Sequence, residues 1–338
     1  EAVSLVVTDL LHVVISFQSW GNLFAFPQNG ESLEALWILM SLINVWRIPI
    51  VFMISGMGIR FAMEHRNWKA LLKDRTVRIL VPYVFGFSVV GPLNLYFASL
   101  FYQKPGSYIP NPGHLWFLGH IYAYVLVFLA ILNYLINHPD HVISRALSKL
   151  FEIPYGIYLL VLPFLLEAIL VNPKSYPAYF NTQHGFWLGL ICFCTGFVFI
   201  SMKDRFWAAV SLVKKVALVL AVLLYLVRLV FFELSAPNPL IAFESFNWML
   251  AIIGFGSSYL NKPSRTLSYL SQAVFPVYIL HLPLQFLFAL LILPTNLPAI
   301  SKLLLLIVTL GASLLTYELI IRRLKWIRPL FGMKINPS

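Results

Sequence analysis

The sequence contains few charged residues. Only 11% of its 338 residues are Asp, Glu, Lys or Arg, whereas 60% are hydrophobic and 16% are aromatic. A typical soluble domain carries about 25% charged residues and places polar side chains on one face of every element. The scarcity of charge therefore excludes an ordinary soluble protein and predicts a chain that crosses a membrane several times.

The chain also lacks any long stretch of water-soluble composition that would form a second domain. Its apolar segments reach about 20 residues, the length that a helix needs to cross about 30 Å of hydrocarbon. The predicted fold is thus an all-α, polytopic membrane helix bundle with a single domain over residues 1–338. About ten spans are expected, near residues 2–20, 36–60, 77–100, 115–136, 154–171, 184–201, 214–233, 245–260, 273–293 and 300–321.

Cysteine is nearly absent. Cys192 and Cys194 are the only two, and a metal site would need further His or Cys ligands close to this C-x-C pair. We therefore predict that both thiols are buried apolar groups and that the protein uses neither a metal nor a resident cofactor. The chain starts at Glu1 without an initiator Met, so we expect its N-terminal end to be shortened.

Acidic residues are few, and the 24 Lys and Arg residues give a formal net charge of +11. With the N-terminus inside, nineteen basic residues fall on the inner side of the predicted spans and three on the outer side. The positive-inside rule then places both termini in the cytoplasm of a multi-pass protein, and we expect the cell inner membrane. Basic residues held at an anionic leaflet explain the charge without a nucleic-acid partner.

One short inner loop has an unusual density of positive charge. It holds Arg66, Lys69, Lys73, Arg75 and Arg78. Such a loop fixes topology, and it also suits the phosphates of an anionic cytosolic ligand.

Three protonatable or cationic residues lie inside apolar runs, namely His12, Arg47 and His281. An ionisable side chain in hydrocarbon costs at least about 2.5 kcal/mol, so it is retained mainly where it faces a partner or a cavity. Asp9 precedes His12 by three residues, on the same helical face, and its carboxylate would leave one imidazole nitrogen able to take a proton. This pattern is typical of an oriented general base; the alternative is a histidine that only packs between helices.

Arg47 remains charged because a guanidinium does not lose its proton at neutral pH. An ion pair with Glu167 or Asp9 would satisfy it, and so would an anion or a carbonyl oxygen in a cavity. Arg228 poses the same question in the seventh span.

His114 and His281 have informative surroundings. His114 begins the fourth span on the outer side, within the run H-L-W-F-L. His281 lies between Pro276 and Pro283, which predicts an irregular backbone that lines a cavity. A buried packing histidine is an equally good interpretation of His281.

These elements resemble the membrane acyltransferase 3 family, and most closely its branch of periplasmic glucan succinyltransferases. The resemblance extends over the whole chain and rests on the order of several short strings. They are His12, the run R-x-P-x-x-F-x-I-S-G from Arg47 to Gly56, Arg75-Thr76-Val77-Arg78 with Pro82, H-L-W-F-L at His114, Tyr278-Ile279-Leu280-His281, and the tail from Glu318 through Arg328-Pro329-Leu330-Phe331-Gly332.

The resemblance implies an O-acyltransferase that moves an acetyl or succinyl group from cytosolic acyl-CoA to a hydroxyl of an extracytoplasmic carbohydrate or glycan. It implies that His12, oriented by Asp9, is the base and that Arg47 stabilises the oxyanion or positions the thioester. Arg75 and Arg78 would hold the coenzyme A phosphates, while His114 and His281 would contact the acceptor. Members carry D-x-x-R about three turns before the histidine, and here the arginine position falls at or before Glu1.

Two other functions fit a bundle with buried charges. A secondary transporter of a small anionic or sugar-like substrate would show inverted repeats, and none is visible in this sequence. A scaffold component of an envelope assembly would use its buried charges for structure alone.

Overall fold

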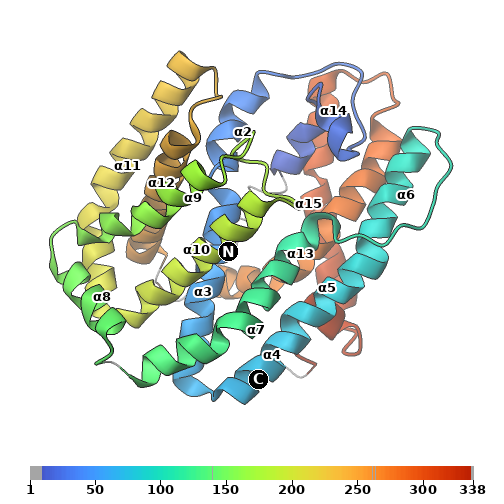
Figure 1. Cartoon of the computed structure of the whole chain (residues 1–338). Helices are drawn as coiled ribbons and strands as arrows, with labels where there is room; N and C mark the ends of the chain where they lie inside the picture. Colours follow the sequence, from blue (N-terminus) through green and yellow to red (C-terminus); the bar gives the residue numbers. More distant parts are fainter. Residues whose placement is uncertain (1–9, 139, 261, 263, 336–338) are drawn as a thin grey trace. The chain divides into compact units, whose positions relative to one another are not determined.

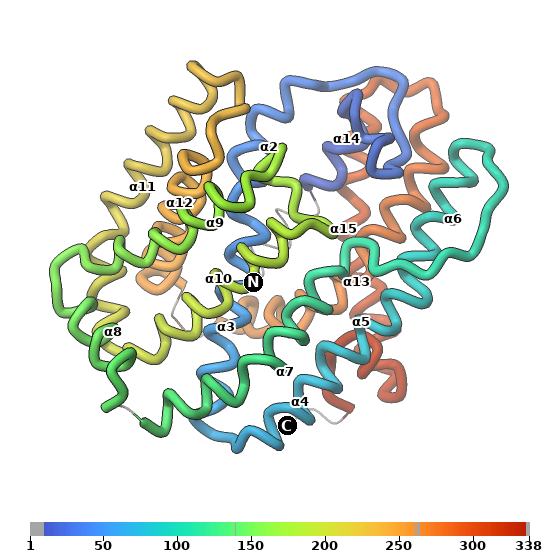
Figure 2. Tube along the Cα trace, viewed as in Figure 1, coloured from blue at the N-terminus to red at the C-terminus, as the bar shows by residue number. Residues whose placement is uncertain are grey.

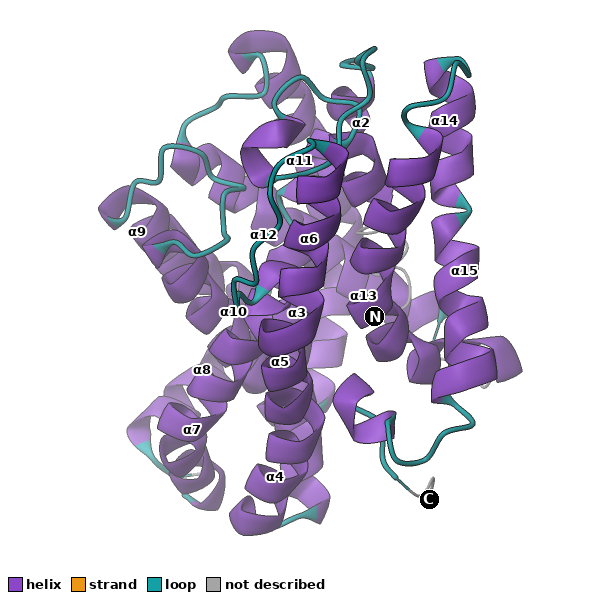
Figure 3. Ribbon diagram, turned by 90° about the vertical axis from the view of Figure 1, so that its right-hand side faces the viewer, coloured by secondary structure: helices purple, strands orange, loops and turns teal. Residues whose placement is uncertain are grey.

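A computed structural model of the chain describes residues 10–138, 140–260, 262 and 264–335. In these residues the elements are helices and no strand occurs (Figure 3). Eight helical stretches of this part are long and apolar enough to cross a membrane. They are Leu36–His65, Trp68–Phe101, Gly113–Asn137, Gln183–Ser201, Asp204–Phe232, Asn238–Tyr259, Arg265–Ile292 and Ala299–Ile321.

This architecture confirms the predicted polytopic helix bundle. Eight of the ten expected spans coincide with these long helices, and the span near 154–171 is a shorter apolar helix, Gly156–Leu170. The remaining span, near 2–20, lies partly outside the described residues. The cytoplasmic location of both termini and the identity of the membrane stay predictions.

The chain divides into two compact units, each assembled from segments that are distant in sequence. The first unit comprises Glu1–Met40, Asp74–Gly119 and Ser264–Ser338. The second comprises Ser41–Lys73 and His120–Pro263. A single domain over residues 1–338 stays a prediction.

The first unit is organised around α13 (Arg265–Ile292). Three helices pack against it, α6 (Gly91–Phe101), α14 (Ala299–Ile307) and α15 (Thr309–Thr316). In Figure 2, α6 is cyan and α13 orange, so segments far apart in sequence meet inside this unit. The short α5 (Val81–Phe85) lies between the π-helical turns η2 (Thr76–Leu80) and η3 (Gly86–Val90).

The second unit contains two well-packed helix pairs. α3 (Arg47–His65) packs on α10 (Gln183–Ser201), and α11 (Asp204–Phe232) packs on α12 (Asn238–Tyr259), as Figure 1 shows. α9 (Leu162–Leu170) contacts both α10 and α12.

The other described elements are η1 (Gly21–Phe24), α2 (Leu36–Asn44), α4 (Trp68–Arg75), η4 (Gly113–Leu115), α7 (Trp116–Asn137), α8 (Val142–Glu152), η5 (Gly156–Val161), η6 (Tyr317–Ile321) and η7 (Arg328–Phe331).

Two glycines allow α3 and α10 to approach closely. A Cβ atom at Gly56 would collide with the backbone carbonyl of Phe193, and one at Gly196 would collide with that of Met53. Apolar side chains gain little by leaving lipid for another helix, so close backbone packing at small residues is a main source of helix association in membranes. These glycines therefore hold the core of the second unit together.

A proline explains the break between α2 and α3. Pro49 has no N–H, so the carbonyl of Val45 loses its helical donor. Two hydroxyls from other helices or loops replace that donor: Tyr179 at 2.9 Å and Ser245 at 2.8 Å. Burial raises the pKa of Tyr179 well above its usual range, which keeps its hydroxyl protonated as a donor. Neighbouring side chains thus satisfy a carbonyl that the proline leaves free.

Candidate functional site

Two buried histidines meet in the first unit. Nδ1 of His12 lies 2.9 Å from Nε2 of His281. His12 belongs to the helical residues 10–15, and His281 belongs to α13. His12 is 8% exposed and His281 is fully buried. The bundle thus brings together two of the three ionisable residues that the sequence singled out within its spans.

The hydrogen bonds of this pair assign its tautomers. Nδ1 of His281 lies 2.6 Å from the carbonyl oxygen of Tyr278, which only accepts, so this nitrogen carries a proton. In a neutral ring Nε2 of His281 is then an acceptor, and Nδ1–H of His12 donates to it. The remaining ring nitrogen of His12, Nε2, therefore has the lone pair that takes a proton. This assignment follows from the heavy-atom positions of the hydrogen-bond partners.

His114 supports the pair through Tyr278 of α13. Its Nε2 donates to the carbonyl of Tyr278 at 2.9 Å, and the Tyr278 hydroxyl donates to the carbonyl of His114 at 2.7 Å. Its ring centre lies 4.9 Å from that of His281. These reciprocal bonds fix the carbonyl that orients His281.

Two glycines place His114 at this position. A side chain at Gly91 would collide with the carbonyl of Asn111, and Gly113 has a φ of +48°, in the left-handed region that favours glycine. The chain turns here, through η4, into α7. The segment before His114 therefore packs tightly on the start of α6.

α13 is continuous from Arg265 to Ile292, with Pro276 and Pro283 inside it. The expectation of an irregular backbone around His281 was therefore wrong. Burial of the imidazole, and its bonds to His12 and to the carbonyl of Tyr278, mark this position instead.

Two other residues were assigned to catalysis, Asp9 and Arg47. Asp9 falls outside the described residues. Arg47 begins α3 in the second unit, is half-buried, and its Nε donates to Oδ1 of Asn44 at 3.0 Å. Glu167, considered as its ion-pair partner, instead lies 2.8 Å from Nδ1 of the buried His184. Sequence reasoning did not identify this buried carboxylate–imidazole pair, because no local spacing links two residues on different helices.

Arg228 has a protein partner. Its Nε and Nη2 contact the two carboxylate oxygens of Glu244 at 2.7 and 3.0 Å, and Nη2 also donates to the carbonyl of Ser41. The guanidinium is 2% exposed and the carboxylate is fully buried. This bidentate pair gives Arg228 a structural role within the second unit.

The two basic residues assigned to the donor lie close together in the first unit. Arg75 ends α4 and is half-buried, and Arg78 follows in η2 and is exposed. Nε of Arg78 donates to the carbonyl of Gly332 at 3.3 Å. Arg78 thus also holds the C-terminal turn, a contact that the loop sequence does not reveal.

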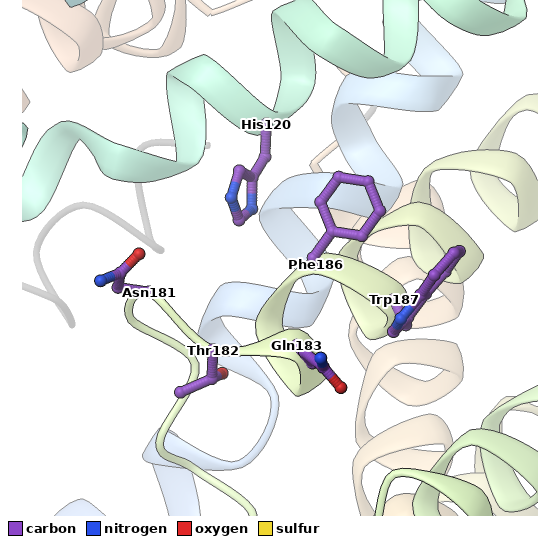
Figure 4. Close-up of a pocket in the computed structure, with 6 residues that line it drawn as sticks. All are labelled: His120, Asn181, Thr182, Gln183, Phe186 and Trp187. Atoms are coloured by element: carbon purple, nitrogen blue, oxygen red, sulfur yellow. The ribbon is translucent and has the colours of Figure 1, made fainter.

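The second unit has an open pocket of about 410 Å³. Its lining combines the rings of His120, Phe186 and Trp187 with the polar side chains of Asn181, Thr182 and Gln183 (Figure 4). His120 comes from α7, whereas the others lie at or just before the start of α10. Figure 4 shows the His120 ring between Asn181 and Phe186. Aromatic faces with amides are suited to a polar ring-shaped ligand such as a sugar.

In the described residues no group of three His, Cys, Asp or Glu side chains is placed to hold a metal ion. Cys192 is buried and Cys194 is half-buried, and both are free thiols. The absence of a metal or cofactor stays a prediction.

Comparison with known proteins gives one result. A protein-family model described as an acyltransferase domain matches residues 10–318. No curated protein and no solved structure was found to match.

Proposed function

The chain belongs to this acyltransferase family and is a membrane acyltransferase, and from that premise we propose that it moves an acyl group from cytosolic acyl-CoA to a hydroxyl of an extracytoplasmic carbohydrate. The observation that carries the proposal is the chain of hydrogen bonds from the Tyr278 carbonyl through His281 to His12. With His281 neutral, these bonds leave the lone pair of His12 on Nε2, in a side chain that is 8% exposed.

The reaction needs one base that later acts as an acid. Nε2 of His12 takes the proton of the acceptor hydroxyl as its oxygen attacks the thioester carbonyl, forming the new C–O bond. The tetrahedral intermediate then collapses, the C–S bond breaks, and the imidazolium returns the proton to the leaving thiolate. The products are an ester and coenzyme A, and His281 stabilises the transient charge on His12 through the hydrogen bond to Nδ1.

Cationic side chains supply the remaining electrostatics. We assign to Arg47 stabilisation of the oxyanion or positioning of the thioester, because a guanidinium stays charged where a lysine would discharge. We assign to Arg75 and Arg78 the phosphates of coenzyme A, on the inner side of the predicted topology. Both roles rest on residue type and on the resemblance of the sequence strings.

The acceptor is proposed to be a carbohydrate because of the pocket around Trp187. Its aromatic and amide lining suits a sugar ring, and the loop before α10 lies on the outer side in the predicted topology. Of the two acyl groups, succinyl is the one favoured by the resemblance of the sequence to the glucan succinyltransferase branch. Arg228 is not available to bind its carboxylate, because Glu244 already occupies the guanidinium.

Membership of an acyltransferase family favours covalent transfer over the transporter alternative. Reconstituted vesicles distinguish the two. Radiolabelled acetyl-CoA or succinyl-CoA is supplied at the cytoplasmic face, with glucose or a linear gluco-oligosaccharide at the other. Acyl transfer predicts labelled sugar ester and released coenzyme A. Movement of unmodified sugar or acyl-CoA across the vesicle, without ester, would overturn the proposal.

A further inference from the structure

Several buried polar atoms of the first unit have no hydrogen-bond partner. Both amide atoms of Gln285 and both of Asn94 lack one, as do the Ser16 hydroxyl and Nδ1 of His114. The four side chains are between 0% and 9% exposed. An unsatisfied buried polar group is destabilising, and native structures contain few of them. These atoms are therefore candidates for binding a ligand.

Two of these side chains follow the two histidines in sequence. Gln285 comes four residues after His281 on α13, which brings it onto the same helical face, and Ser16 lies in the turn directly after the helical residues 10–15 that contain His12.

Both segments lead toward the same end of the unit. Nζ of Lys302 donates to Oδ1 of Asn29 and to the carbonyl of Leu293, residues that lie further along the same two segments. The predicted topology places Lys302 on the outer side. Gln285 and Ser16 therefore lie on the acceptor side of His12.

Asn94 and His114 belong to two other segments that meet α13. Asn94 is on α6, which packs against α13, and its Nδ2 lies beside Gly113. The next residue, His114, is bonded to Tyr278 on α13. All four side chains thus belong to the α6–α13–N-terminal part of the first unit.

The kind of atom left unpaired restricts the ligand. Each amide offers a donor and an acceptor whichever way it is flipped, and the hydroxyl offers both. Since Nε2 of His114 donates to Tyr278, its Nδ1 is an acceptor. An anion presents only acceptors and would leave the amide oxygens and this nitrogen unsatisfied. A neutral polyol presents O–H groups that both donate and accept.

We infer that Gln285, Asn94 and Ser16 form a recognition site for the neutral hydroxyls of the acceptor, beside His12. The inference rests on the proposed function and assigns to these residues the positioning of the hydroxyl that is acylated. Gln285 binds a neighbouring hydroxyl and so fixes which oxygen of the polyol faces Nε2 of His12. No charged side chain belongs to the set, so the site selects a neutral sugar.

The test uses the full chain in vesicles with radiolabelled acyl-CoA and three acceptor probes: glycerol, glucose and maltoheptaose. The variants are Gln285→Met, Asn94→Leu and Ser16→Ala. The control is Gln272→Met, which removes an exposed amide from the same helix. We expect the half-saturating polyol concentration to rise about tenfold in Gln285→Met and to stay at the wild-type value in the Gln272→Met control.

Thermal unfolding gives a second readout for the same variants. Replacing an unpaired buried amide with an apolar side chain of similar length should leave the midpoint unchanged or raise it, whereas loss of a structural hydrogen bond would lower it. If Gln285→Met is not recovered as folded protein, Gln285→Glu serves in its place and should weaken polyol binding by charge burial. A folded Gln285→Glu variant with an unchanged half-saturating polyol concentration would overturn the inference.

Two outcomes distinguish failure of the recognition site from failure of the proposed acyl transfer. Labelled ester from the wild type with an unaltered polyol dependence in all three variants would overturn the recognition site and leave the acyltransfer proposal intact. No ester from the wild type with any polyol would overturn both.

Discussion

Nδ1 of His12 lies 2.9 Å from Nε2 of His281, joining residues that are 269 positions apart in the chain. Because His281 is oriented by a backbone carbonyl, the proton between the two rings belongs to His12. With His281 neutral, its Nε2 is the acceptor in this bond. This relationship accounts for two protonatable residues inside apolar helices and gives each a separate role.

Removing the orienting ring should slow transfer without abolishing it. In His281→Ala the imidazole of His12 loses the acceptor for Nδ1–H, so both its tautomer and its orientation are released. We expect kcat to fall on the order of 10²-fold, with little change in KM for acyl-CoA. His281→Gln, which retains an acceptor oxygen, should recover part of the activity. Equal losses in both variants would indicate a packing role for His281 instead.

Reversing the charge of Arg75 should weaken donor binding. Arg75→Glu places a carboxylate where the proposal puts coenzyme A phosphates, so KM for acyl-CoA should increase at least about tenfold. Arg323→Glu is the matched control, because Arg323 is an exposed cation of the same unit. The measurement is initial rate against acyl-CoA concentration. A similar change in KM for acyl-CoA in both variants would indicate that the inner-loop charge fixes only the topology.

Trp187 should contribute to binding of an extended acceptor. Trp187→Ala removes the largest aromatic face of the open pocket, and we expect weaker binding of maltoheptaose by about tenfold. Binding of glucose should change less, because a single sugar needs fewer contacts. Trp68→Ala is the control, since Trp68 is 45% exposed and Trp187 is 47% exposed. Unchanged use of the oligosaccharide would dissociate this pocket from the acceptor.

The glycines between α3 and α10 should be required for stability. Gly56→Ala and Gly196→Ala each force a methyl group into a backbone carbonyl, and we expect a lower midpoint of thermal unfolding in detergent, by several degrees or more. Gly58→Ala serves as the comparison, because an added Cβ atom there meets nothing within 4 Å. It should leave the midpoint unchanged or raise it through helix propensity. Tolerance of all three substitutions would contradict the proposed close packing.

The sequence predicted the fold class because length and hydropathy determine a membrane-spanning helix almost without tertiary information. Nine of the expected spans appear as apolar helices in the described residues. His12 and His281 were also identifiable, since a protonatable group in an apolar run is costly, whereas His114 was identified from the H-L-W-F-L string.

What the sequence did not reveal is which residues meet. The bonds of His281 with His12, of Arg228 with Glu244 and of Glu167 with His184 connect different helices. No spacing along one helix encodes them. An i, i+3 spacing detects only partners on the same helix, and the orienting role predicted in this way for Asp9 stays a prediction.

Single-turnover acyl transfer in vesicles containing His12→Ala tests the role of His12 as the base. With folding verified by an unchanged elution profile and thermal midpoint, we expect loss of labelled ester by about 10²- to 10⁴-fold, the usual contribution of a general base. Binding of acyl-CoA should persist. A folded His12→Ala protein that forms ester at close to the wild-type rate would contradict the assignment of His12 as the base.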